Sequence, residues 1–322
     1  MKAAVIYQVG SMPQYAEIAE PVVQQENNVL VKVRAVAIKH LDRAVASGKH
    51  YSSGQTSGAR IVGGDGIGVL PDGQRIYGFG VGGTLAEQAI FLKSWSTPVP
   101  DGLDDITAAA LPNAVMGSAM ALLFRAQLQH GETVLINGAT GFTGKMAIQL
   151  ARHYGAGKII VTGRNQETLN SLTELGADQL ISLNENDEAI VSQLKAIHAV
   201  TPIHVVIDYL WGHSAQLILS ALKGSGTFSP RTRYVSIGAM SGDIIQLSSQ
   251  ILRSIDLQLS GSGLGSWTKD EIGLLFREIL PEIFQLAAAG KLKVEVITVS
   301  LKDIEQLWET DPGNGKRLVV SI

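Results

Sequence analysis

The chain has no cysteine among its 322 residues. Disulfides, thiolate-bound zinc, iron–sulfur clusters and a cysteine nucleophile are therefore excluded. Charge is also sparse: charged residues make up 17% of the chain, the formal net charge is -3, and no long basic run is present. Because a nucleic-acid-binding protein carries a basic electrostatic footprint, we expect no nucleic-acid partner and favour small-molecule chemistry.

Long apolar runs are missing as well. The first six residues, Met1 to Ile6, are followed by polar residues and form neither a signal-peptide core nor a membrane span. We expect a cytoplasmic protein with no membrane partner. The seven histidines are scattered, and none has carboxylate or cysteine neighbours at ligand spacing, so no metal site is expected.

The residues that are present favour two domains, because 322 residues with 45% hydrophobic content exceed one ordinary core. Up to Pro112, short apolar runs such as 29–33 are broken by turn signals such as Pro71-Asp72-Gly73, which predicts an all-β module. After Pro112, strands and helices alternate, which predicts an α/β domain with a parallel sheet covered on both faces.

The alternating pattern predicts individual elements. Strands are expected at 133–137, 158–162, 180–183, 205–207 and near Val235 and Leu257, with helices at 144–154, 188–197 and 214–222. A helix with an apolar stripe from Ile272 to Ile283 and strands at 294–299 and 317–322 follow, and we expect this tail to rejoin the first module.

A glycine-rich turn follows the strand at 133–137 and precedes a helix. Its residues are Ala139, Thr140, Gly141, Phe142, Thr143 and Gly144. Gly141 lets the backbone approach a pyrophosphate, and Gly144 lets the helix pack closely on the sheet, although Ala139 stands where the first glycine usually is. Glycines also make tight turns without any ligand, but the strand–turn–helix context favours a dinucleotide site.

The end of the next strand indicates which dinucleotide binds. Gly163, Arg164 and Asn165 offer a cation and an amide instead of the acidic residue that grips the ribose 2′-hydroxyl in NAD sites. This predicts NADPH, unless Arg164 is simply a solvated surface residue. Two later strands end at Asp208 and just before Gly238, where Gly238 is a plausible nicotinamide contact and Asp208 is at least as well explained as a loop anchor.

In this order of parts the chain resembles the medium-chain dehydrogenase/reductase superfamily over essentially its whole length. The segment 37–51 looks like part of the zinc-independent quinone oxidoreductase branch, matching it at Asp42, Gly48 and Tyr51. It departs from that branch at three positions, where Lys39 replaces an asparagine, His40 a proline and Ala46 an arginine.

A second stretch, 62–68, resembles the GHExxG motif of the same superfamily. Gly64 stands where zinc-dependent members place a histidine ligand, and Asp65 stands where they place a glutamate. Together with the absence of cysteine, this makes a zinc alcohol dehydrogenase untenable.

The resemblance implies a GroES-like, β-rich catalytic domain over 1–112 and 261–322, and a doubly wound Rossmann domain over 113–260. It implies a homodimer or homotetramer. It also implies NADPH contacts from the glycine-rich turn, from Arg164, from the loop Gly238-Ala239-Met240 and from Leu264.

The implied activity is NADPH-dependent, zinc-independent reduction of an electrophilic small molecule, a quinone or an α,β-unsaturated carbonyl, by direct hydride transfer. Tyr51 or Lys39 is a candidate to donate the proton or to hydrogen-bond the carbonyl oxygen, and water is a third source. Each side chain also has a purely structural interpretation, as a half-buried aromatic and a surface cation. The competing hypothesis is a non-catalytic NADPH-binding sensor or structural protein.

Overall fold

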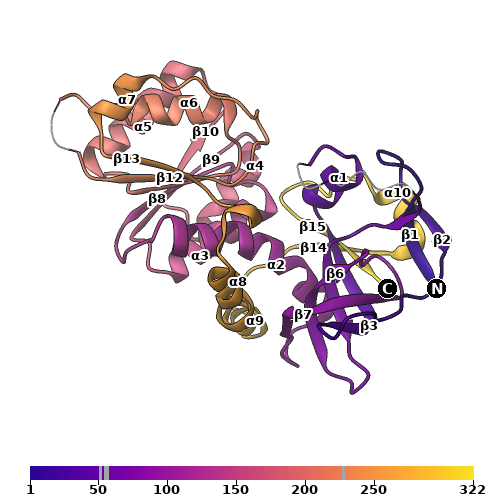
Figure 1. The fold of residues 1–322 in the computed structure, drawn as a ribbon. Helices are drawn as coiled ribbons and strands as arrows, with labels where there is room; N and C mark the ends of the chain where they lie inside the picture. Colours follow the sequence, from indigo (N-terminus) through magenta and orange to yellow (C-terminus); the bar gives the residue numbers. More distant parts are fainter. Residues whose placement is uncertain (51–52, 54–57, 227–228) are drawn as a thin grey trace. The chain divides into compact units, whose positions relative to one another are not determined.

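The computed structural model describes residues 1–50, 53, 58–226 and 229–322. Two compact units make up the chain (Figure 1): unit 1 comprises Met1–Asn113 and Ile272–Ile322, and unit 2 comprises Ala114–Glu271. Unit 2 is thus inserted into the sequence of unit 1, whose two parts fold together.

Unit 1 is built on two sheets. Their strands are β1 (Lys2–Ile6), β2 (Gln14–Glu17), β3 (Asn28–Ile38), β4 (Arg60–Ile61), β5 (Asp65–Val69), β6 (Arg75–Val81), β7 (Gln88–Pro98), β14 (Val296–Ser300) and β15 (Arg317–Ser321). The larger sheet has the order β14-β15-β3-β5-β6-β7, and β3 pairs with β7 as well, so the strands from β3 to β7 close on themselves. The smaller sheet has the order β2-β1-β4.

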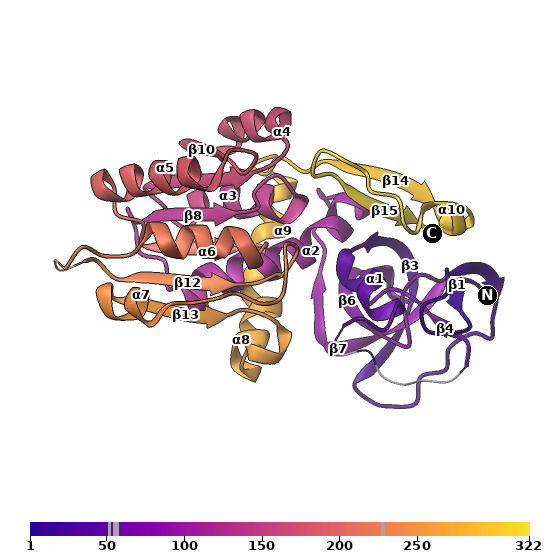
Figure 2. The same cartoon turned by 90° about the horizontal axis from the view of Figure 1, so that it is seen from above.

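The C-terminal tail joins this unit as expected. Strand β15 pairs antiparallel with β3, with Leu318 opposite Ile38, and Figure 2 shows the yellow strands β14 and β15 beside the first part of the chain. Leu318 and Val320 are buried in one core cluster with Val36 and Ile38. Burial of this alternating apolar face stabilises the pairing of the two chain ends.

Unit 1 also contains helices. Two of them begin before Pro112 and contradict the all-β module expected there, whereas a helix over 272–283 was predicted. The helices of unit 1 are α1 (His40–Ala46), the start of α2 (Asp105–Met120), the end of α8 (Lys269–Leu274), α9 (Leu280–Ala288) and α10 (Ile304–Leu307). Helix α1 is short and buries only Asp42 and Ala46, so it leaves no apolar period in the sequence. Its first turn is closed instead by Asp42, whose Oδ2 accepts a hydrogen bond from the Lys39 backbone amide at 2.9 Å.

Unit 2 is a six-stranded parallel sheet in the order β10-β9-β8-β11-β12-β13. Its strands are β8 (Thr133–Asn137), β9 (Lys158–Gly163), β10 (Gln179–Ser182), β11 (Val205–Asp208), β12 (Thr232–Ser236) and β13 (Leu257–Gly261). Its complete helices are α3 (Phe142–His153), α4 (Gln166–Ser171), α5 (Asp187–Val200), α6 (Gly212–Ala221) and α7 (Ser249–Ser254).

The strand order reverses between β8 and β11, and the sheet is covered on both faces. In Figure 1, helices α5, α6 and α7 lie along one face and α3 lies along the other. Ligands of such sheets bind at the carboxyl edge near the reversal point, which here means the ends of β8 and β11. The predicted strand 133–137 and the doubly wound α/β class are confirmed.

The segment 261–271 groups with unit 2, whereas the family resemblance placed it in the returning part of the β-rich domain. Arg125 links this segment to the rest of unit 2, because its guanidinium donates to Glu271 at 2.9 Å and to the Ser266 carbonyl oxygen at 2.6 Å. These bonds hold the residues after β13 against the π-helical extension of helix α2, Ala121–Arg125.

Among the described residues, one helical stretch, Asp105–Arg125, has the length and composition of a membrane span. Its most apolar window is 72% buried inside the molecule, as in the core helix of a globular protein.

Candidate functional site

The glycine-rich turn lies between β8 and α3. A Cβ atom on Gly144 would lie 2.5 Å from the Ala139 Cα, so only glycine allows the helix to approach the turn so closely. A Cβ on Gly141 would meet no atom within 4 Å. None of the described side chains caps the N-terminus of α3, and its first turn has no acidic residue. With glycine at the N-cap and no acidic residue in its first turn, the positive end of this 12-residue helix favours an anionic group such as a pyrophosphate.

The end of β9 lies against this turn. A Cβ on Gly163 would lie 2.3 Å from Thr140 Cγ2, so the two segments are in contact. Asn165 accepts a hydrogen bond from the Thr168 amide at 2.9 Å and thereby caps helix α4. The side-chain oxygen of Asn165 is therefore used locally, while Arg164 is exposed.

Asn184 is a further polar residue at this edge that the sequence analysis missed. Its Nδ2 donates to the Arg164 carbonyl oxygen at 2.6 Å. Asn184 follows β10, which is the parallel neighbour of β9, so its position after a strand end is the signal that would have identified it.

The third part of the edge is the loop after β12, with Gly238, Ala239 and Met240. The Gly238 amide donates to the Asp208 carbonyl oxygen at 3.3 Å, and a Cβ on Gly238 would lie 2.7 Å from the Tyr209 carbonyl oxygen. Met240 is 59% exposed. Leu264, 43% exposed, follows the outermost strand β13. All the cofactor candidates thus follow strand ends at the carboxyl edge of one sheet.

The two catalytic candidates lie in unit 1. Tyr51 lies outside the described residues. Lys39 is 3% exposed, and its ammonium contacts Asp65 directly and lies 3.2 Å from Asp42 Oδ2. Asp65 also accepts a hydrogen bond from the Tyr77 hydroxyl at 2.6 Å. Lys39 is therefore a buried, doubly ion-paired residue rather than the surface cation that its structural interpretation supposed.

Burial and the neighbouring carboxylates shift the pKa of Lys39 in opposite directions. Burial lowers its pKa, but Asp42 and Asp65 more than offset this effect, so the pKa is raised above its ordinary value. Arg317, also buried, lies near the same two carboxylates, and burial lowers its pKa to about 10 although they raise it. The cluster Lys39, Asp42, Asp65 and Arg317 carries two cations and two potential anions.

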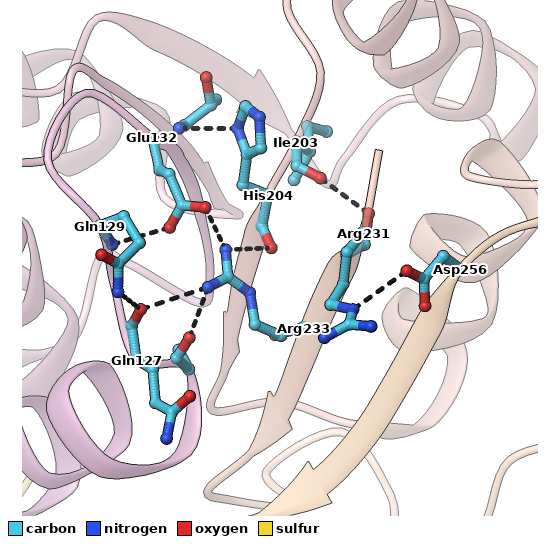
Figure 3. A network of polar contacts seen from close by, with 11 residues as sticks. Gln127, Gln129, Glu132, Ile203, His204, Arg231, Arg233 and Asp256 are labelled. Atoms are coloured by element: carbon cyan, nitrogen blue, oxygen red, sulfur yellow. Dashed lines mark hydrogen bonds and ion pairs between the residues drawn. The ribbon is translucent and has the colours of Figure 1, made fainter. Parts of the chain in front are cut away.

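A second polar network occupies the opposite, amino edge of the unit 2 sheet (Figure 3). Arg233 contacts Glu132 and donates to the carbonyl oxygens of Ala126 and Gln127 at 2.8 and 3.2 Å. The Thr133 amide donates to His204 Nδ1 at 3.1 Å. These residues lie at or just before the amino-terminal ends of β8, β11 and β12, at the opposite end of the strands from the predicted cofactor edge. Their hydrogen bonds hold the first residues of these neighbouring strands together.

Lowering the pH is expected to destabilise unit 2 through His198. This half-buried side chain accepts a hydrogen bond from the Ile203 amide at Nδ1, at 3.1 Å, and burial together with His204 lowers its pKa. The neutral ring is therefore favoured in the folded state, so its contribution is complete above its unfolded pKa and is lost as the pH falls through the folded pKa. Thermal unfolding should show a decrease in Tm between about pH 7 and 5 that shrinks in His198→Ala.

The exposed His213 supplies the matched control for this measurement. Its side chain is 63% exposed and pairs with Asp187 at the surface. His213→Ala should retain the pH dependence of the wild type. The same loss of pH dependence in both variants would show that the effect does not come from His198.

Comparisons with known proteins agree with the fold. Residues 143–279 match a family model described as zinc-binding dehydrogenase. The chain is 25% identical over 283 residues to a quinone oxidoreductase of Rattus norvegicus, covering 84% of this chain and 82% of the relative. A mycobacterial quinone oxidoreductase structure has a TM-score of 0.85 at 19% identity, with 100% of both chains covered. The quinone oxidoreductase of Thermus thermophilus, also solved with NADPH, has a TM-score of 0.77 at 26% identity over 100% of both chains.

The residues of this chain do not fit the zinc ion that the family description mentions. The chain has no cysteine, and the part that the structure describes contains no group of three His, Asp or Glu side chains that could hold a metal. Gly64 and Asp65 stand at the histidine and glutamate positions of the GHExxG motif. Gly64 has no side chain, and the carboxylate of Asp65 is bound to the Lys39 ammonium and the Tyr77 hydroxyl. Zinc ligands are thiolates, imidazoles or carboxylates, and an ammonium cannot replace them.

Proposed function

Because this chain belongs to the medium-chain dehydrogenase/reductase superfamily, in its quinone oxidoreductase-like branch, we propose that it is an NADPH-dependent, zinc-independent reductase of quinones or α,β-unsaturated carbonyls. The observation that carries this proposal is the start of helix α3, where Gly141 leaves space beside the backbone and the first turn has no acidic residue to repel a pyrophosphate. The proposal includes a cytoplasmic location and a homodimer or homotetramer.

Unit 2 supplies the cofactor site in this proposal. Backbone groups of the turn from Ala139 to Gly144 bind the pyrophosphate, since this turn leads into the positive end of the α3 dipole. Arg164 pairs with the 2′-phosphate, flanked by Gly163 and Asn165. The loop Gly238-Ala239-Met240 and Leu264 lie on the nicotinamide side.

Bound NADPH supplies a hydride, so that NADPH, a quinone and one proton give NADP⁺ and a hydroquinone, and an enone gives the saturated carbonyl. Gly64 and Asp65 provide no zinc site, so no zinc ion polarises the carbonyl group of the acceptor in this proposal. The acceptor must therefore be electrophilic enough to take the hydride directly. The protein contributes orientation and exclusion of water. Tyr51, Lys39 or water donates the proton, and the ion pairs of Lys39 make it the weaker candidate of the two side chains.

Arg164→Asp tests the cofactor assignment. The change replaces a cation by an anion beside the 2′-phosphate of NADPH, whereas NADH has no charge at that position. We expect the NADPH dissociation constant to rise at least about tenfold, in line with the loss of a charge-assisted hydrogen bond, and that of NADH to stay level or fall. Fluorescence titration with both nucleotides measures the two constants.

Arg253→Asp is the matched control, since Arg253 is an exposed cation of the same unit on helix α7. It should leave both constants unchanged. Equal changes in the NADPH and NADH dissociation constants of Arg164→Asp would contradict the assignment of Arg164 to the 2′-phosphate.

One observation favours the non-catalytic alternative, a sensor or structural protein that binds NADPH. Lys39, where the branch has an asparagine, is buried and paired within unit 1. Absorbance at the nicotinamide band with a panel of quinones and conjugated enones separates the two functions. Oxidation of NADPH supports the reductase, and binding without oxidation across the panel supports the alternative.

A further inference from the structure

Asp208 is buried at the end of β11, where the strand order of the unit 2 sheet reverses. It is 0% exposed, and no cation contacts it among the residues that the structure describes. Its Oδ1 accepts hydrogen bonds from Asn137 Nδ2 at 2.7 Å, the Leu210 amide at 2.8 Å and the Trp211 amide at 3.0 Å. Its Oδ2 accepts one from the Tyr234 hydroxyl at 2.6 Å. Four donors thus satisfy this carboxylate inside the protein.

The bonds to Leu210 and Trp211 hold a strained turn. Trp211 has φ 54 and ψ -151, a conformation that is rare for any residue with a side chain. Such a conformation persists only where surrounding contacts determine it, and here they are the Asp208 carboxylate and the Tyr234 ring, which meets the Trp211 ring edge-on at 6.0 Å. The turn Tyr209–Trp211 is called the brace below.

The brace contacts the glycine-rich turn on one side. Gly138 has φ 86, and a Cβ there would lie 2.7 Å from Leu210 Cγ, so the Leu210 side chain covers the residue that leads directly into the glycine-rich turn. Asn137, which precedes Gly138, is bound to Asp208 as well and accepts a hydrogen bond from the Thr162 hydroxyl at 2.7 Å.

The brace contacts the loop after β12 on its other side. The Met240 amide donates to the Tyr209 carbonyl oxygen at 3.4 Å, and the Ser241 amide donates to that of Leu210 at 2.8 Å. Trp211 also forms an isolated parallel bridge with Gly242. The brace therefore joins the two segments that the proposed function assigns to the pyrophosphate and to the nicotinamide.

We propose that Asp208 is a positioning residue for the cofactor: its carboxylate fixes the brace, and the brace sets the placement of the glycine-rich turn and of the 238–242 loop. This inference rests on the proposed function, because it concerns the same nucleotide site. Asp208 contacts neither the nucleotide nor the acceptor in this assignment, and acts through Leu210 and Trp211.

The test compares the binding of NADPH to purified wild type, Asp208→Ala, Asp208→Asn and Leu210→Ala. Asp208→Ala removes all four acceptor contacts, and we expect the NADPH dissociation constant to rise about 10- to 100-fold, which corresponds to a binding-competent population of about 10% to 1%. Asp208→Asn keeps an oxygen for the three donors at Oδ1, so its NADPH dissociation constant should stay within about threefold of that of the wild type. Leu210→Ala withdraws the side chain from Gly138 without leaving a polar group unpaired and should raise the constant at least about threefold, so the test does not depend on Asp208→Ala folding.

Leu194→Ala separates positioning from general loss of stability. Leu194 is 1% exposed in the core beneath α5, away from the carboxyl edge, and its truncation should lower Tm while leaving NADPH affinity unchanged. Hydrogen exchange of the nucleotide-free protein adds a readout that is independent of binding: Asp208→Ala should speed exchange at Met240 and Ser241, whereas Leu194→Ala should not.

Each outcome is decisive. Weaker binding in Asp208→Ala and Leu210→Ala, with recovery in Asp208→Asn, supports the brace. Wild-type affinity in both alanine variants, or a loss no greater than in Leu194→Ala, overturns the inference and leaves the proposed function intact. Failure of the wild type to bind either NADPH or NADH overturns the proposed function and the positioning role together.

Discussion

Gly144→Ala is expected to destabilise the protein and to abolish high-affinity NADPH binding, whereas Gly141→Ala is expected to weaken binding alone. The added Cβ at Gly144 would overlap the backbone of Ala139 at 2.5 Å, so helix α3 must move away from the sheet. Overpacking of this kind costs about 1–3 kcal/mol of unfolding free energy. At Gly141 the Cβ meets nothing within 4 Å and φ is -80, so the fold accepts alanine. That Cβ would instead occupy the space through which a pyrophosphate reaches the backbone.

Thermal unfolding and NADPH titration of both variants measure the two effects. We expect a lower Tm only in Gly144→Ala, and a dissociation constant raised at least about tenfold in both, equivalent to roughly 1.4 kcal/mol. Gly102→Ala is the control, because its Cβ would make only an ordinary contact of 3.7 Å with Ala288 in unit 1. Wild-type NADPH affinity in Gly141→Ala would mean that the glycine-rich turn only shapes the backbone.

Lys39→Met is expected to destabilise unit 1 strongly. The side chains of Asp42 and Asp65 are 4% and 6% exposed, and removal of the ammonium takes away the cation that contacts both of them. Breaking a buried ion pair by removing one partner costs about 3–5 kcal/mol, because the remaining charge stays buried. Chemical denaturation with urea measures the loss. Lys2→Met is the control: the Lys2–Glu17 pair has side chains 43% and 75% exposed, and surface pairs of this kind contribute little to stability.

The double variant Lys39→Met with Asp65→Asn separates the electrostatic role of Lys39 from a chemical one. An asparagine at 65 keeps an acceptor for the Tyr77 hydroxyl and removes one buried negative charge, so most of the lost stability should return. If NADPH oxidation returns as well, Lys39 serves the charge cluster and is not the proton donor. Stability that returns without activity would identify the ammonium as a group required in the reaction.

The elements of unit 2 were predictable from the sequence for a physical reason. A parallel strand buried on both faces is a continuous apolar run, and a covering helix carries an apolar stripe, so β8 and α3 are visible in the pattern of residues 133–154. Glycines placed between such a strand and such a helix are typical of a nucleotide-binding turn, which made the segment from Ala139 to Gly144 recognisable. Helix α1 left no such pattern, because a polar residue closes its first turn and it buries only two residues.

Some features of the candidate site were likewise predictable from the sequence, and others required the folded structure. Composition and local periodicity were enough to establish the absence of thiolate chemistry, the α/β class of the inserted unit and the position of the glycine-rich turn. The folded chain was needed to show that Lys39 is buried between Asp42 and Asp65, that Asn184 reaches the Arg164 backbone, and that Asp208 anchors the brace. The contacts of Lys39 and Asn184 join residues that are 3 to 26 positions apart. Burial and hydrogen-bond partners set the charge and role of a polar side chain, and they exist only once the sheets have formed.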